Sequence, residues 1–108
     1  MPRNPDRGEV WLVDLGLAAK VRPCLVISVA LDDTDRALIS VVPHTTSVYG
    51  SRFEVDVQSR FLKRGVFDVQ NLITIPLAKL IRKLGSLDAK QLETVEKALR
   101  RWLGLEKE

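Results

Sequence analysis

Arg22 and the polar segment His44–Ser47 are the residues of this sequence whose types and spacing best suit chemistry. An apolar run begins after Arg22, a polar turn follows at Asp32–Asp35, and a second apolar run ends in His44–Ser47. If the two runs pair as an antiparallel hairpin, residues that face each other have numbers that sum to about 67 or 68. Arg22 then lies beside Thr45 or Thr46. One permanent cation and several hydroxyl groups meet where the strands end, which favours an anion-binding site.

The alternation of side chains along a strand narrows the choice of hydroxyl. His44 and Thr46 share one face of the strand, while Thr45 points to the other. Residues directly opposite each other share a face, so only one of the two threonines can be the close neighbour of Arg22. A shift of one residue in the register exchanges Thr45 and Thr46 as the neighbour of Arg22, so the residues alone leave both threonines possible.

Several neighbouring residues are further candidates for catalysis or anion contact. His44 is the only histidine, and its unperturbed pKa near neutrality suits a general base, although a surface or capping histidine is the commoner outcome. Ser47 adds a hydroxyl. Lys20 lies one loop turn before Arg22, and Arg52 follows the threonines closely. Both cations could hold a flanking anionic group.

Composition limits the class of protein. The chain has 108 residues, of which 45% are hydrophobic and 29% charged, as expected for one folded domain. No apolar run approaches the ~18 residues of a membrane helix, and the N-terminal residues lack the apolar core of a signal peptide. We therefore expect a cytoplasmic protein without membrane contact. Cys24 is the only cysteine, and acidic residues are not grouped at ligand spacing, so we expect no metal site and no cofactor.

The elements that must position these residues follow from hydrophobic patterning. Residues 1–6 hold two prolines and are expected to form a flexible tail. Apolar or alternating runs predict strands over residues 9–15, 24–31, 37–42, 52–57, 66–75 (one strand or two) and 81–84. One helix is expected over residues 89–103, capped by Asp88 with Gln91 and ended by Gly104. The pattern predicts a mainly β fold with a C-terminal helix, a small partly open β-barrel in a single domain over residues 7–104, and a short tail at 105–108.

Three segments together resemble a known family. Gly8–Leu15, Val21–Ile27 with its Arg-Pro start, and Val42–Thr46 with its Pro-x-Thr-Thr end are similar in sequence and spacing to the MazF/PemK toxin endoribonucleases of type II toxin–antitoxin systems. The resemblance extends over roughly residues 7–103. It implies an SH3-like barrel of the CcdB/PemK type.

The resemblance also implies a reaction. Arg22 and Thr46 match the expected catalytic pair, for metal-independent, sequence-specific cleavage of single-stranded RNA (mRNA) to 2′,3′-cyclic phosphate and 5′-hydroxyl ends, which inhibits translation and growth. A guanidinium suits the charge that develops on phosphate oxygens, and hydroxyls can donate further hydrogen bonds. A homodimer and a cognate antitoxin protein are the implied partners.

This sequence departs from the family at two places. The loop Gly16–Val21 is shorter than in many relatives and lacks a carboxylate, and Ile73 occupies the place of a basic residue in the stretch Gln70–Ile73. These departures keep two alternatives open: a non-enzymatic, CcdB-like toxin that acts by binding a protein such as gyrase, and an RNA-binding barrel that does not cleave.

Overall fold

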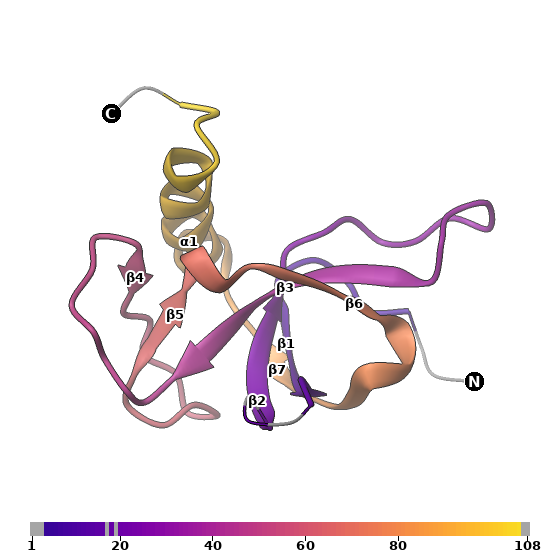
Figure 1. Ribbon diagram of the computed structural model, residues 1–108, viewed down its shortest axis with the longest axis horizontal. Helices are drawn as coiled ribbons and strands as arrows, with labels where there is room; N and C mark the ends of the chain where they lie inside the picture. The colour runs from indigo at the N-terminus through magenta and orange to yellow at the C-terminus, as the bar shows by residue number, and fades with distance from the viewer. Residues whose placement is uncertain (1–3, 17, 19, 107–108) are drawn as a thin grey trace.

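A seven-stranded antiparallel sheet and one C-terminal helix make up the computed structural model, which describes residues 4–16, 18 and 20–106 (Figure 1). The strand order is β4-β5-β3-β2-β1-β7, and β6 also pairs with β3. The sheet does not close, which confirms the predicted mainly β, partly open barrel. The elements are β1 (Glu9–Asp14), β2 (Val21–Val26), β3 (Leu38–Thr45), β4 (Glu54–Val55), β5 (Val66–Asp68), the 3₁₀ turn η2 (Val69–Asn71), β6 (Ile73–Pro76), the 3₁₀ turn η3 (Leu77–Lys79), β7 (Leu80–Ser86) and α1 (Ala89–Trp102).

Strand β3 is shared between two parts of the sheet. Residues 38–41 pair with β6 and residues 41–43 pair with β2, whereas the last two residues, His44 and Thr45, pair with β5. The change of partner follows Pro43, which has no N–H to donate to a ladder. The end of β3 therefore leaves β2, so that space opens beside the first residues of β2.

Side-chain alternation divides the core between the two faces of the sheet. One cluster includes Phe67 and is covered by Val95 and Leu99 of α1. The cluster on the other face includes Trp11, which is only 8% exposed. Because opposite residues in a sheet share a face, these clusters also fix which residues at the strand ends point to which side.

The helix forms as its sequence predicts. The Asp88 carboxylate accepts a hydrogen bond from the Gln91 amide at 2.8 Å, and the Gln91 side chain accepts one from the Asp88 amide at 3.0 Å. At the other end Gly104 has a φ of +71°, and the amide of Leu105 bonds to the carbonyl of Arg100 at 2.9 Å. This left-handed glycine stops the helix and satisfies its last carbonyls.

Strand β1 lies between β2, which follows it in the chain, and β7, the last strand. It pairs with β2 on one edge and with β7 on the other, where Glu9 lies opposite Ser86. Pro5 is fully buried, and the amide of Asp6 donates to Glu9 Oε1 at 3.0 Å. Pro5 and Asp6 therefore contact the body of the domain, while residues 1–3 of the tail expected over residues 1–6 lie outside the described part. No helix in the described part has the length and apolar character needed to cross a bilayer.

Two expected strands are shorter than their patterns suggest. The strand expected over residues 24–31 ends at Val26, and residues 27–37 form a long connection to β3. The alternating residues 52–57 contribute only Glu54–Val55, because their partner β5 is three residues long. Residues 66–75 form two strands separated by η2, which is one of the two alternatives expected from the sequence.

Candidate functional site

The β2–β3 ladder ends at Cys24 and Pro43, two residues short of Arg22, and its register indicates which threonine lies on the Arg22 face of the sheet. The ladder pairs Cys24 with Pro43, a sum of 67, so the lower of the two expected values is observed. Extended to the start of β2, the same register sets Thr45 across from Arg22 and on its face of the sheet. Thr46 then belongs to the other face. The choice of Thr46, which rests on the family resemblance, stays a prediction, and the register favours Thr45.

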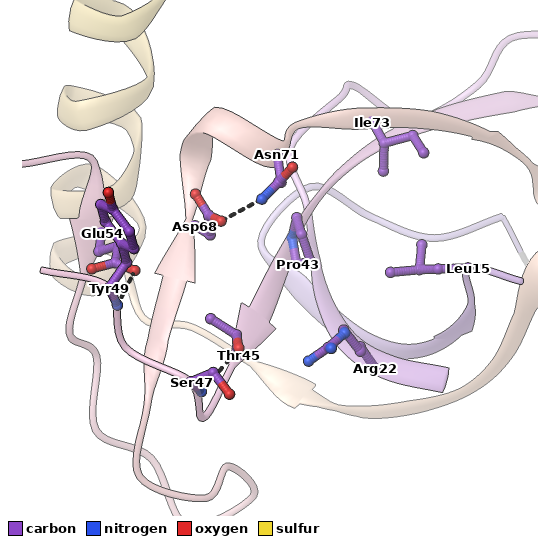
Figure 2. A pocket seen from close by; sticks show the side chains of 10 residues that line it. All are labelled: Leu15, Arg22, Pro43, Thr45, Ser47, Tyr49, Glu54, Asp68, Asn71 and Ile73. Carbon is purple, nitrogen blue, oxygen red and sulfur yellow. Dashed lines mark hydrogen bonds between the residues drawn. The ribbon is translucent and has the colours of Figure 1, made fainter. Parts of the chain in front are cut away.

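A pocket of ≈ 350 Å³ lies on the Thr45 side of Arg22. Figure 2 shows the Arg22 side chain extending toward the end of β3, where Thr45 and Ser47 lie. Thr45 Oγ1 accepts a hydrogen bond from the amide of Ser47 at 3.0 Å, which leaves the hydroxyl proton able to be donated. The lining residues are Leu15, Arg22, Pro43, Thr45, Ser47, Tyr49, Glu54, Asp68, Asn71 and Ile73.

One edge of this pocket is a loop held by a carboxylate. Glu54 accepts hydrogen bonds from three successive backbone amides, those of Tyr49 at 2.9 Å, Gly50 at 2.5 Å and Ser51 at 3.0 Å. These bonds, that from Tyr49 above all, lower the pKa of Glu54. Gly50 has a φ of +98°, a conformation that side chains other than glycine rarely adopt. The loop is thereby fixed with the Tyr49 side chain 91% exposed at the rim.

The opposite wall is polar at one point and apolar elsewhere. Asp68, at the end of β5, accepts a hydrogen bond from the Asn71 side-chain amide at 2.5 Å (Figure 2). Ile73, Leu15 and Pro43 supply the apolar surface. In total one cation and two carboxylates line this pocket.

A second pocket, of ≈ 370 Å³, lies on the other face of the sheet and is also lined by Arg22. It has the opposite charge character, because three of its lining residues are cations and none is a carboxylate. His44 reaches it from the end of β3, and Thr46, the first residue after that strand, lines it as well. Its lining residues are Leu12, Val21, Arg22, Pro23, His44, Thr46, Phe61, Lys63, Arg82 and Leu84.

His44 is buried rather than exposed. Its side chain is 3% exposed and packs edge-on against Phe67, with ring centroids 5.1 Å apart. Its Nε2 atom has no hydrogen-bond partner among the residues that the structure describes. Burial lowers the pKa of His44, and the nearby Asp56 opposes this only in part. The imidazole is therefore neutral at physiological pH.

The remaining predicted residues are not brought to either pocket. Lys20 is exposed with a φ of +55°, and its amide bonds to the carbonyl of Gly16 at 3.0 Å, which closes the short loop before β2. The guanidinium of Arg52 lies 4.4 Å from the centroid of the Phe53 ring. Neither residue lines the pockets beside Arg22.

Four charged residues of the two pockets are not predicted from the sequence: Glu54, Lys63, Asp68 and Arg82. Each comes from a different segment, and no local spacing connects any of them to Arg22. Within residues 4–16, 18 and 20–106, no group of three or more metal-ligating side chains gathers.

Comparisons with known proteins agree on one family. Residues 6–103 match the model of the "PemK-like, MazF-like toxin of type II toxin-antitoxin system". The chain is 28% identical to the Mycobacterium tuberculosis toxin MazF-mt6, with a TM-score of 0.78 over 92% of this chain and 99% of that one. It is 27% identical to MazF from Deinococcus radiodurans, with a TM-score of 0.79 over 95% and 99%. A mycobacterial endoribonuclease in complex with its cognate antitoxin has the same fold, at 24% identity and a TM-score of 0.79 over 99% and 100%.

Proposed function

Because the chain belongs to the PemK-like, MazF-like toxins of type II toxin–antitoxin systems, we propose that it is a metal-independent endoribonuclease that cleaves single-stranded RNA. Cleavage of mRNA would inhibit translation and growth. The observation that carries the proposal is the position of Arg22 at the end of β2, where it lines both pockets and faces the hydroxyls at the end of β3.

The chain's own groups can supply what the reaction requires. The 2′-hydroxyl of a ribose attacks the adjacent phosphorus, so the O2′–P bond forms while the P–O5′ bond breaks. The products are a 2′,3′-cyclic phosphate and a 5′-hydroxyl, and one proton moves from O2′ while another reaches O5′. The Arg22 guanidinium is always charged and can bind two phosphate oxygens as negative charge builds on them.

Thr45 is the hydroxyl that we assign to Arg22. It lies on the same face of the sheet, and its oxygen already accepts from Ser47, so its proton is directed elsewhere. Thr46, which the family resemblance favours, lies on the opposite face and lines the cationic pocket with Arg22. Replacing each threonine by valine distinguishes the two assignments, because only the loss of the hydroxyl that takes part in the reaction lowers the cleavage rate of bound RNA.

The cationic pocket provides a path for the RNA backbone. Arg22, Lys63 and Arg82 place three positive charges around one cavity, and no carboxylate lines it. Phosphates bound there release counterions, so affinity for RNA should fall with increasing salt. Lys20 and Arg52 lie outside both pockets and would contact only more distant phosphates.

The partners of the protein follow from the same family. A mycobacterial structure of this fold is an endoribonuclease in complex with its cognate antitoxin. We assign this chain a cognate antitoxin that blocks the RNA site, a homodimeric state and a place in the cytoplasm. An acidic antitoxin segment would suit the cationic pocket beside Arg22.

The decisive experiment is cleavage in the presence of a chelator. Purified protein and the Arg22→Ala variant are incubated with mixed RNA and EDTA, and the product ends are sequenced. We expect 5′-hydroxyl and cyclic phosphate ends from the wild type, and at least a hundredfold loss in the variant, in line with removal of a transition-state charge partner. Wild-type cleavage by Arg22→Ala refutes the mechanism. If no RNA products form at any protein concentration, the CcdB-like binding function or simple RNA binding takes its place.

A further inference from the structure

The two pockets beside Arg22 differ in charge, and this difference assigns different parts of an RNA chain to them. Apart from the scissile phosphate at Arg22 and Thr45, phosphates are attracted to the pocket with three cations, and the wall of the other pocket that carries Glu54 and Asp68 disfavours them. A neutral nucleobase has no such conflict with the carboxylate pocket. The volume of ≈ 350 Å³ and the mixture of apolar walls with a few polar groups are typical of a site for a small organic group.

Tyr49 provides the surface on which a base would stack. Its side chain is 91% exposed at the rim of the pocket, although a large aromatic ring is usually covered. It is not loose, because three amides of its loop are bound by Glu54. An exposed aromatic ring on a fixed loop is what proteins use to grip unpaired bases.

Asp68 supplies the hydrogen-bond chemistry of the pocket. Both oxygens of Glu54 already accept from the loop, so this carboxylate is occupied. Asp68 uses Oδ2 to accept from Asn71. Asp68 lines the pocket, and among the residues that the structure describes no donor is assigned to its other oxygen, Oδ1; a carboxylate oxygen suits an exocyclic amine.

We infer that the Tyr49–Asp68 pocket holds one unpaired nucleobase that carries an exocyclic amino group, with the ring on Tyr49 and the amine on Asp68. Adenine, cytosine and guanine carry such an amine. Uracil presents a carbonyl oxygen at the corresponding position, which the carboxylate repels. The inference rests on the proposed function, and it names the bases that the same site selects next to the cleaved phosphate.

Binding of RNA that cannot be cleaved tests the inference separately from catalysis. The probes are 2′-O-methyl hexanucleotides, one all uracil and the others with a single cytosine moved along the chain, because these bases differ mainly by a carbonyl and an amine. We expect cytosine at one fixed position to improve the affinity of the wild type about tenfold. Equal affinity for cytosine and uracil at every position overturns the inference.

Two pairs of variants assign the effect to these residues. In Asp68→Asn the amide oxygen is retained by Asn71, so an N–H group faces the pocket and the preference should change to uracil. Asp33→Asn, an exposed carboxylate in the connection before β3, should leave the preference unchanged. Tyr49→Ala should weaken binding of every probe about tenfold, and Tyr49→Phe should retain it. A cytosine preference that survives in Asp68→Asn refutes the role of this carboxylate.

Cleavage of natural RNA by the same proteins distinguishes the two proposals. If the wild type binds the probes selectively but does not cut RNA, the nuclease function fails and the base pocket stands. If it cuts RNA but neither the sequenced sites nor the affinities change in Asp68→Asn, the base pocket fails and the nuclease function stands.

Discussion

Replacing Gly65 by alanine should damage both the fold and the site, because no space exists for a methyl group there. Gly65 precedes β5, and a Cβ built on it would lie 2.2 Å from the carbonyl oxygen of Thr45 and 2.8 Å from His44 Cε1. These separations are about 1 Å short of ordinary contact. The carbonyl belongs to the β3–β5 ladder, where Thr45 lies opposite Val66, so it cannot move without the strand.

The expected loss of stability is large for a single methyl group. Overpacking in a core costs about 1–3 kcal/mol, and the upper part of that range applies because backbone atoms must shift. For a domain of this size, each kcal/mol lowers Tm by about 4–8 °C. Urea unfolding followed by tryptophan fluorescence measures the free energy directly. Cleavage of RNA below Tm should also fall, since the same shift moves Thr45 relative to Arg22.

Gly85→Ala is the matched control. Its Cβ would meet ring atoms of Phe61 at 2.5 Å, which is as close, but the obstacle is a half-buried side chain that can rotate. We therefore expect Gly85→Ala to lose less stability than Gly65→Ala. If Gly65→Ala unfolds within about 0.5 kcal/mol of the wild type, or if the two variants are equivalent, the reasoning from the backbone contact is refuted.

Three further predictions concern buried ionisable groups. Because burial lowers the pKa of His44, the unfolded chain binds a proton that the folded chain does not, and stability should fall as pH decreases below about 6.5, by at most ~1.4 kcal/mol per pH unit. Urea unfolding at a series of pH values should show this slope. Because the chain has no other histidine, the same slope in His44→Gln would contradict the assignment. Burial raises the pKa of the Cys24 thiol to about 12, so an alkylating reagent at pH 8 should modify it only after denaturation; rapid modification of the native protein would be the contrary result. Burial alone would raise the pKa of Glu9, but hydrogen bonds from the Trp11 indole, the backbone of Asp6 and Lys83 lower it to about 2, so its contribution to stability should disappear as pH falls from about 5 to 2. Glu9→Ala should lose about 1–3 kcal/mol at pH 7, because it leaves the buried Trp11 N–H without its acceptor, and it should show less acid sensitivity in that interval than the wild type.

The parts of the fold that depend on nearby residues could be predicted from the sequence. The capped helix and its glycine stop depend on contacts within a few residues, and both are confirmed at Asp88 and Gly104. The hairpin could be predicted to within one residue, because its turn and its apolar runs are continuous in the chain. The remaining choice between two registers depends on long-range packing, and a shift of one residue exchanges Thr45 and Thr46 as the neighbour of Arg22.

The rest of the site could not be predicted, because it depends on segments far apart in the sequence. Asp68 reaches its pocket because β5 pairs with β3, Arg82 reaches the other from β7 beyond β1, and Lys63 comes from the connection before β5. The burial of His44 has the same origin, since its ring packs against Phe67 of β5, which pairs with the end of β3. Neither hydrophobic period nor local spacing contains that information.

The pairing of β1 with β7 has a consequence for how the molecule is made. Glu9 and Ser86 are opposite each other, so the first strand to leave the ribosome has to wait for the last one before both its edges are covered. Pairings at such long sequence separation form slowly, within about milliseconds to seconds, and the ribosome adds only about 5–20 residues per second. The β2–β3 hairpin, which carries Arg22, is synthesised well before the strand that completes its sheet. The nascent chain therefore contains its candidate catalytic groups for seconds before it has the framework that holds them in place.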